Sequence, residues 1–163
     1  VALLVAGGPL RAQDAPATIE RPRRAVTLVG GVSQYDLSGT GSTPILGARY
    51  EVERGRVLLT EVAFGTINAP AQFGGRQRLT TLEGQLQAQL PLGPVRPYLG
   101  AGAGVASLTN APGVVLTVSG AAGTRVALPG NRWELRGELR VRGVTREFTG
   151  SAAEWTGGLA YRF

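Results

Sequence analysis

The 163-residue sequence contains no cysteine, no histidine, no methionine and no lysine, so all 17 of its basic residues are arginine. Without cysteine, neither a disulfide bond nor a thiol nucleophile is available. The joint absence of histidine and cysteine excludes the usual zinc sites and a Ser-His-Asp triad. No run of 18 or more apolar residues occurs, which excludes a transmembrane helix.

Glycine is abundant, with 25 of the 163 residues, which is about twice its usual share. Hydrophobic residues make up 43% of the chain and the mean hydropathy is +0.05, which argues against a disordered chain. Charged residues make up only 17%. A glycine-rich, moderately apolar chain of single-domain length without a spanning helix is typical of a soluble β protein or of a membrane β-barrel.

Residues 133–144 alternate between apolar and charged side chains. The odd-numbered positions include Trp133, Leu135 and Leu139, whereas every even-numbered residue from 134 to 142 is Glu or Arg. We call each such set of alternate positions in a strand a parity. A period of two predicts a strand with two unlike faces, because the helical period of 3.6 would scatter the charges around a helix.

The same alternation recurs along the chain and predicts eight strands. The predicted ranges are Ala25–Tyr35, Leu46–Glu53, Leu58–Gly65, Thr80–Leu90, Val95–Val105, Val114–Leu128, Trp133–Val144 and Glu154–Phe163. Most have the length of about 9–11 residues that a tilted strand needs to cross a bilayer. We therefore predict an all-β fold for residues 25–163, an eight-stranded antiparallel up-and-down transmembrane β-barrel.

The connections between these strands are expected to differ in length at the two ends of the barrel. Tight turns are predicted at Arg54–Gly55, Pro91–Pro94 and Pro129–Arg132, and longer loops at Asp36–Thr43, Ile67–Gln77, Thr109–Gly113 and Thr145–Ala153. Short turns at one end and longer loops at the other are typical of outer-membrane barrels.

The polar parity of the strands decides which face meets lipid. It holds charges of both signs in near balance, and these would pair inside a narrow barrel that is filled by its own side chains. The predicted interior charge network comprises Arg49, Glu51, Glu61, Glu83, Arg96, Arg125, Glu134, Arg136, Glu138, Arg140, Arg142, Glu154 and Arg162. Glycines on the same parity, such as Gly102 and Gly123, would leave room for long side chains. The alternative is a soluble lipocalin-like barrel with apolar residues inside.

Four aromatic residues on the apolar parity are predicted to lie at the two membrane interfaces, where such residues form girdles. Tyr50 and Trp133 are expected toward the tight turns, and Phe64 and Trp155 toward the longer loops.

The last ten residues read EWTGGLAYRF. Gly158, Leu159, Tyr161 and the final Phe163 match the C-terminal strand signal of bacterial outer-membrane proteins. On this motif and the eight predicted strands, residues 25–163 resemble the small outer-membrane barrels of the OmpA transmembrane-domain and OmpX class. The resemblance implies a bacterial outer-membrane location with both termini periplasmic. It also implies partners, namely the barrel-assembly machinery, outer-membrane lipid and lipopolysaccharide.

The first residues, VALLVAGGPL, have the length and composition of the apolar region of a signal peptide. They predict a truncated signal peptide over residues 1–12, followed by a periplasmic segment over residues 13–24. The alternative is a first buried strand.

No residue pattern predicts a catalytic, cofactor-binding or metal site, and we predict that the protein is not an enzyme. Outer-membrane barrel enzymes such as the lipid A deacylases and palmitoyltransferases use a His with a Ser, and this sequence has no His. Glu134 and Glu138 would be poor general acids beside arginines. The formal charge of +6 does not indicate nucleic acid as a partner, because about half of the arginines fall on the inward parity.

The sequence leaves more than one function open. The first is a barrel with a plugged Arg/Glu interior that has a structural or surface-interaction role through its extracellular loops. The second is a small pore or ligand-conducting barrel, and the third is a soluble periplasmic lipocalin-like binding barrel. No cofactor is implied, and no motif identifies what the loops bind.

Overall fold

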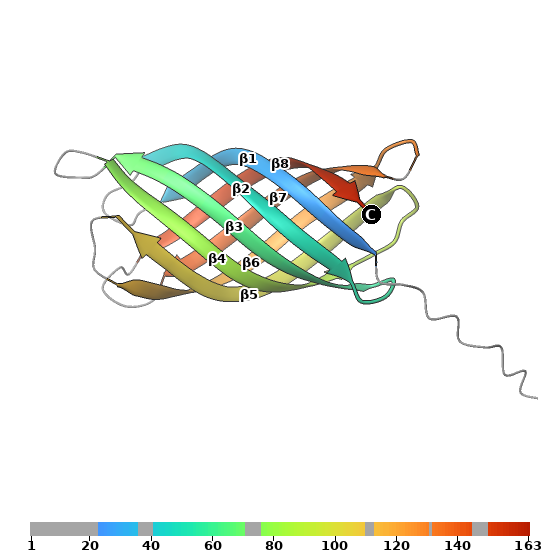
Figure 1. Ribbon diagram of the computed structural model, residues 1–163, viewed down its shortest axis with the longest axis horizontal. Coiled ribbons are helices and arrows are strands. Elements are labelled where there is room, and N and C mark those ends of the chain that lie inside the picture. Colours follow the sequence, from blue (N-terminus) through green and yellow to red (C-terminus); the bar gives the residue numbers. More distant parts are fainter. Residues whose placement is uncertain (1–22, 36–40, 71–75, 110–112, 131, 145–149) are drawn as a thin grey trace, which may run out of the picture.

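The computed structural model describes residues 23–35, 41–70, 76–109, 113–130, 132–144 and 150–163, which form eight strands (Figure 1). The strands are β1 (Arg24–Tyr35), β2 (Gly41–Glu53), β3 (Leu58–Pro70), β4 (Arg76–Gln89), β5 (Val95–Leu108), β6 (Val114–Ala127), β7 (Trp133–Val144) and β8 (Gly150–Arg162). These residues include no helix that is long and apolar enough to span a membrane. The predicted signal peptide, residues 1–12, and most of the predicted periplasmic segment, residues 13–24, lie outside the described residues.

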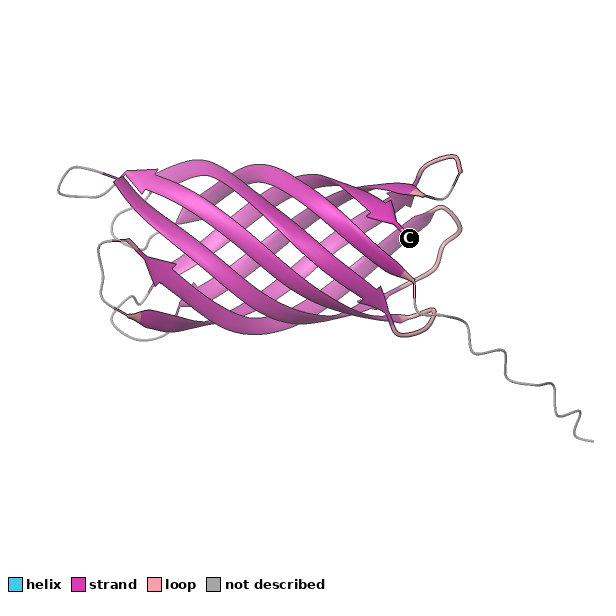
Figure 2. Cartoon of the chain, viewed as in Figure 1, coloured by secondary structure: helices cyan, strands magenta, loops and turns pink. Residues whose placement is uncertain are grey.

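Each strand pairs antiparallel with the next strand in the sequence, and β8 pairs with β1 to close the barrel (Figure 2). A path that starts at Ala25 and passes from each residue to its partner on the next strand goes once around the barrel. It returns to β1 at Tyr35, ten residues further along the strand than it began. Such a stagger requires strands that are tilted against the barrel axis. The tilt brings side chains from distant parts of the sequence to the same height inside the barrel.

The apolar parity of the strands faces outward. Leu28, Leu46 and Leu99 expose 68%, 65% and 68% of their surface, whereas polar neighbours such as Thr27 and Arg49 are almost completely buried. Exposed leucine and valine side chains around the whole wall suit a bilayer, and a soluble barrel would have the opposite arrangement. The predicted eight-stranded transmembrane β-barrel is therefore confirmed.

Glycines shape the turns at the end of the barrel that carries the C-terminus, which we call the turn end (Figure 1). Gly55, Gly93 and Gly130 lie one in each of its three turns, with φ angles of 129°, 66° and 90°. Residues with a side chain rarely adopt such angles, so glycine lets the chain reverse within a few residues.

The predicted difference in loop length between the two ends is wrong. The connections at the opposite end, the loop end, span residues 36–40, 71–75, 109–113 and 145–149, which is five residues each. The turns at the turn end have four or five residues. The prediction fails because β3 and β4 stay paired beyond the apolar stretch, as far as Pro70 and Arg76.

Replacement of Leu139 by arginine should test the outward orientation. Leu139 lies near the middle of β7 and pairs with Trp155 of β8. Arg at that depth should lower the free energy of unfolding in vesicles by roughly 2–4 kcal/mol, because it places a charge in hydrocarbon. The matched control is Val114→Arg at the first residue of β6, where the loss should be about 0–1 kcal/mol. Equal losses at both positions in urea unfolding would contradict the orientation.

Candidate functional site

The inward parity of the strands places a network of arginine and glutamate side chains inside the barrel. All the residues predicted for this network form at least one ion pair, and all are buried except Arg162, which is half-buried. They come from β2 to β8. Strand β1 contributes small inward residues instead, among them Thr27, whose hydroxyl donates to Glu51 at 3.1 Å.

Glu138 of β7 lies at the centre of the network. Its carboxylate accepts hydrogen bonds from Arg49 Nη1 at 2.5 Å and from Arg136 Nη2 at 2.5 Å. Arg140 Nε donates to the same carboxylate at 3.0 Å, and the hydroxyl of Tyr98 donates at 2.5 Å. One carboxylate therefore accepts hydrogen bonds from three guanidinium groups on two strands.

Arg140 connects this centre to further carboxylates on β3 and β4. Its guanidinium group lies 2.8 Å from Glu61 and 3.0 Å from Glu83. Glu83 also accepts from Arg142 Nε at 2.8 Å, and Arg142 pairs in addition with Glu154 of β8. These contacts cross the interior, so the network ties together opposite sides of the wall.

A separate ring of four charges occupies the turn end. Arg96 Nη1 lies 3.0 Å from Glu53, and Arg162 Nη1 lies 2.9 Å from Glu134. The crosswise pairs Arg96–Glu134 and Arg162–Glu53 complete the ring. Glu53 was not among the predicted network residues, although it lies on the polar side of β2.

The interior charges balance in number. The arginines are Arg49, Arg96, Arg125, Arg136, Arg140, Arg142 and Arg162, and the glutamates are Glu51, Glu53, Glu61, Glu83, Glu134, Glu138 and Glu154. Every acidic residue that the structure describes belongs to this set. A buried charge without a partner costs several kcal/mol, so equal numbers are what a sealed interior requires.

Two uncharged residues hold part of the network in place. The Tyr98 hydroxyl accepts from Arg136 Nε at 2.7 Å, and its ring centroid lies 4.1 Å from the Arg125 guanidinium carbon. The side-chain amide of Gln87 donates to Glu61 at 2.9 Å and accepts from Arg125. Neither residue was predicted for the network, because the prediction rested on formal charges alone, although both side chains lie on the inward face of their strands.

A glycine leaves space for the aromatic side chain of Tyr98 in the interior. A Cβ atom at Gly123 would lie 2.5 Å from the Tyr98 hydroxyl oxygen, closer than two such atoms approach. Gly120, on the opposite face of the same strand, has no atom within 4 Å of the corresponding position. The inward glycines are therefore part of the packing of the network.

An apolar cluster fills the interior toward the loop end. Ile45, Ile67, Leu79, Ala106 and Leu108 are buried and pack together. Four of them follow one row of paired residues across β2, β3, β4 and β5. This cluster was not predicted, because all five residues lie outside the predicted strand ranges and Ile67 falls in a predicted loop.

The four predicted interfacial aromatics all face outward, with exposed fractions from 38% to 57%. Trp133 is the first residue of β7 and packs against Tyr161 at a centroid distance of 5.0 Å, near the turn end. Phe64 lies instead at the midpoint of β3, and Trp155 is the sixth of the 13 residues of β8. Both lie deeper in the wall than predicted, because their strands continue further toward the loop end.

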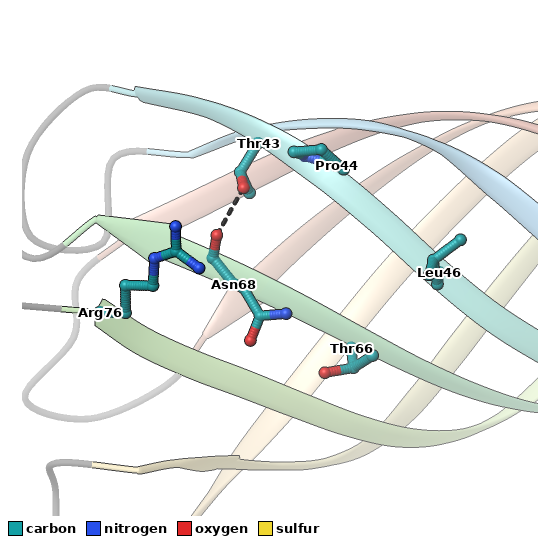
Figure 3. Close-up of a pocket in the computed structure, with 6 residues that line it drawn as sticks. All are labelled: Thr43, Pro44, Leu46, Thr66, Asn68 and Arg76. Atoms are coloured by element: carbon teal, nitrogen blue, oxygen red, sulfur yellow. Dashed lines mark hydrogen bonds between the residues drawn. The ribbon is translucent and has the colours of Figure 1, made fainter.

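A hollow lies at the loop end, where β2, β3 and β4 meet (Figure 3). Its lining residues are Thr43, Pro44, Leu46, Thr66, Asn68 and Arg76. The Thr43 hydroxyl donates to the backbone oxygen of Asn68 at 2.6 Å across one wall of this hollow (Figure 3). The lining combines one charge with small polar groups and contains no pair of residues suited to acid–base chemistry.

Solved structures match the chain along nearly the whole barrel, although no sequence family and no curated protein matches it. Neisserial surface protein A (NspA) gives a TM-score of 0.73 at 15% identity, covering 86% of this chain and 97% of its own. The N-terminal β-barrel domain of Pseudomonas aeruginosa OprF gives 0.64 at 13%, with coverage of 88% and 98%. Ail of Yersinia pestis, in complex with the heparin analogue sucrose octasulfate, gives 0.59 at 13%, with coverage of 88% and 100%.

This chain has the fold of the small outer-membrane β-barrels. The outer membrane enzyme PagL shares the fold as well, with a TM-score of 0.54 at 12% identity and coverage of 84% and 98%. The fold alone therefore does not separate barrels that catalyse a reaction from barrels that do not. Among the described residues, no cluster of acidic side chains is arranged to hold a metal ion.

Loss of the central carboxylate should destabilise the barrel. Glu138→Ala leaves three arginines short of a partner and should lower the free energy of unfolding by about 3–5 kcal/mol. The control is Gln89→Ala, which removes a buried amide whose bond to the Arg56 backbone oxygen measures 3.1 Å, at about 1 kcal/mol. Denaturant unfolding in detergent micelles measures both. Equal losses would mean that the charges of the network do not depend on one another.

Filling the space beside Tyr98 should also destabilise the network. Gly123→Val forces the tyrosine ring out of its position and should cost about 1–3 kcal/mol. Gly120→Val, on the outer face of the same strand, should leave stability unchanged or slightly higher, because valine suits a lipid-facing strand. Thermal unfolding of the two variants provides the measurement, and a neutral result for Gly123→Val would contradict the described packing.

Proposed function

We propose that the protein is an outer-membrane barrel with a plugged interior, whose role is structural or surface interaction through its loop end. The observation that carries the proposal is the filled interior. Arg136 and Arg140 each reach carboxylates on two other strands besides Glu138 of their own strand, so the charged side chains occupy the width of the barrel. An interior that is held together by its own charges leaves none of these groups for a ligand.

The apolar cluster at the loop end supports the plugged interior rather than the pore. Leu79 and Leu108 are paired neighbours in it, and both are almost completely buried. A constriction lined by such side chains excludes water and ions. At the opposite end, the ring around Arg96 and Arg162 covers the network.

The orientation and the partners are part of the same proposal. Both ends of the barrel sequence, Arg24 and Phe163, lie at the turn end, where their backbones are hydrogen-bonded to each other at 3.3 and 3.0 Å. We place this end in the periplasm and the loop end outside the cell. Arg76 and Arg78 are exposed at the loop end, where they would meet the phosphates of lipopolysaccharide. Ail, which was solved with a sulfated sugar, supports an anionic partner for such a surface.

The outward residues of β8, together with Phe163 directly after it, support assembly by the barrel-assembly machinery. Leu159, Tyr161 and Phe163 are all exposed on the lipid face and alternate as the C-terminal signal requires. Gly158 lies on the inward side, where a Cβ atom would be 2.7 Å from the Leu28 backbone oxygen of β1. The signal residues therefore lie on the seam at which the barrel closes.

A reconstitution experiment tests the proposal. The purified protein should run at a shifted position on an SDS gel until it is boiled, because a folded membrane barrel resists the detergent. The same preparation in a planar bilayer should show no steady conductance steps. Regular conductance steps from protein that still shows the heat-dependent shift on the gel would contradict the plugged interior and favour the pore. Protein that stays in buffer without detergent and shows no heat-dependent mobility would overturn membrane insertion itself.

A further inference from the structure

Five exposed arginines gather at the turn end, and we call them the rim arginines: Arg23, Arg24, Arg54, Arg56 and Arg132. Outside the interior network, the described part of the chain has two other arginines, Arg76 and Arg78 at the loop end. The arginines that do not serve the interior are therefore unequally divided between the two ends.

Backbone hydrogen bonds place the rim arginines on adjacent elements. The amide of Glu53, beside Arg54, donates to the Arg23 oxygen at 2.9 Å. On the other side of β1, the amide of Phe163 donates to the Arg24 oxygen at 3.0 Å. The amide of Arg162, at the end of β8, donates to the Arg132 oxygen in the β6–β7 turn at 2.8 Å. The rim arginines thus form an arc over the β6–β7 turn, β8, β1 and the β2–β3 turn.

No acidic side chain among the described residues neutralises this arc. The two glutamates nearest to it along the chain, Glu53 and Glu134, face inward and pair with Arg96 and Arg162. The interior ring thus uses both of these side-chain carboxylates, and the positive charge of the rim arginine side chains is left for an external partner.

Aromatic residues beside the arc indicate its depth. Trp133 directly follows Arg132, and its ring packs against Tyr161 at 5.0 Å, while Tyr161 stacks on Phe163 at 6.4 Å. All three rings are exposed on the lipid face. Aromatic residues prefer the headgroup level of a bilayer, so arginines at the adjacent rim lie at the height of the lipid phosphates.

We propose that the rim arginines bind the phosphate groups of anionic phospholipids in the leaflet at the turn end. The planar guanidinium group suits bidentate contact with phosphate, and several arginines on one arc suit a lipid surface rather than a single small ion. The inference rests on the membrane insertion in the proposed function and goes beyond it, because it assigns a lipid class to one end of the barrel.

Two variants that each remove two charges test the proposal. Arg54→Gln/Arg56→Gln removes the part of the arc in the β2–β3 turn, and Arg76→Gln/Arg78→Gln is the matched control at the loop end. Wild type and both variants are reconstituted in nanodiscs of phosphatidylcholine, with or without phosphatidylglycerol. Gel mobility before and after boiling reports folding, and native mass spectrometry counts the phosphatidylglycerol molecules that stay bound.

The rim variant should retain phosphatidylglycerol at least tenfold more weakly than wild type, since each arginine near an anionic surface contributes about fivefold. The loop-end variant should lose clearly less phosphatidylglycerol than the rim variant, because the described residues place two exposed arginines at that end and five at the rim, and high salt should reduce the difference. Equal losses in both variants, or no enrichment of phosphatidylglycerol in the folded wild type, would overturn the proposal. So would binding of wild type to purified peptidoglycan without lipid enrichment. Failure of wild type to fold in any lipid would instead overturn the membrane assignment, and this proposal with it.

Discussion

The structure depends on the pairing of charges inside a closed wall. Eight strands enclose a space that their own side chains must fill, and this chain fills much of it with arginine and glutamate. Neither residue type is stable there alone, because each loses its hydration without a partner. The partners come from different strands: Arg140 of β7 reaches Glu61 of β3 and Glu83 of β4. The network can therefore form only when the barrel is closed in the correct register.

This requirement links the network to the specificity of the fold. A shift of one residue in the pairing of a strand would turn its charges toward lipid and its leucines inward. For β7 such a shift would move Glu134, Glu138 and Arg140 onto the bilayer face, where each charge is strongly unfavourable. The same alternation that makes the interior polar thus excludes the neighbouring registers. The balance of seven arginines and seven glutamates has the same origin, since an unequal set would leave a charge inside the wall without a partner.

The sequence predicts the strands and the inward parity because both depend on a period of two, which is a local property. Strand β7 begins and ends at the predicted residues, Trp133 and Val144. The pairing of individual charges was beyond the sequence, because it depends on the ten-residue stagger of the barrel. The apolar cluster was also missed, because Ile67 and Leu79 lie outside the predicted strands, in segments where β3 and β4 continue without a strong alternation. The position of Phe64 failed for a related reason, since the strand continues in residues that lack a strong alternation.

The absence of lysine places every positive charge on a guanidinium group, and the barrel divides these groups between two environments. Inside, Arg136 and Arg140 each serve several carboxylates, a role for which a planar group with five donors is better suited than a single ammonium group. Outside, Arg54 and Arg56 face solvent, and the carboxylate of Glu53 next to them pairs with Arg96 and Arg162 instead. Every described glutamate pairs with arginine inside the barrel. The interior is therefore neutral, and no glutamate is left to offset the positive charge of the rim. A charged rim next to Trp133 and Tyr161 favours one depth of the barrel in the bilayer. At that depth the rim arginines lie at the level of the lipid phosphates, and the outward leucines of the wall lie in the hydrocarbon.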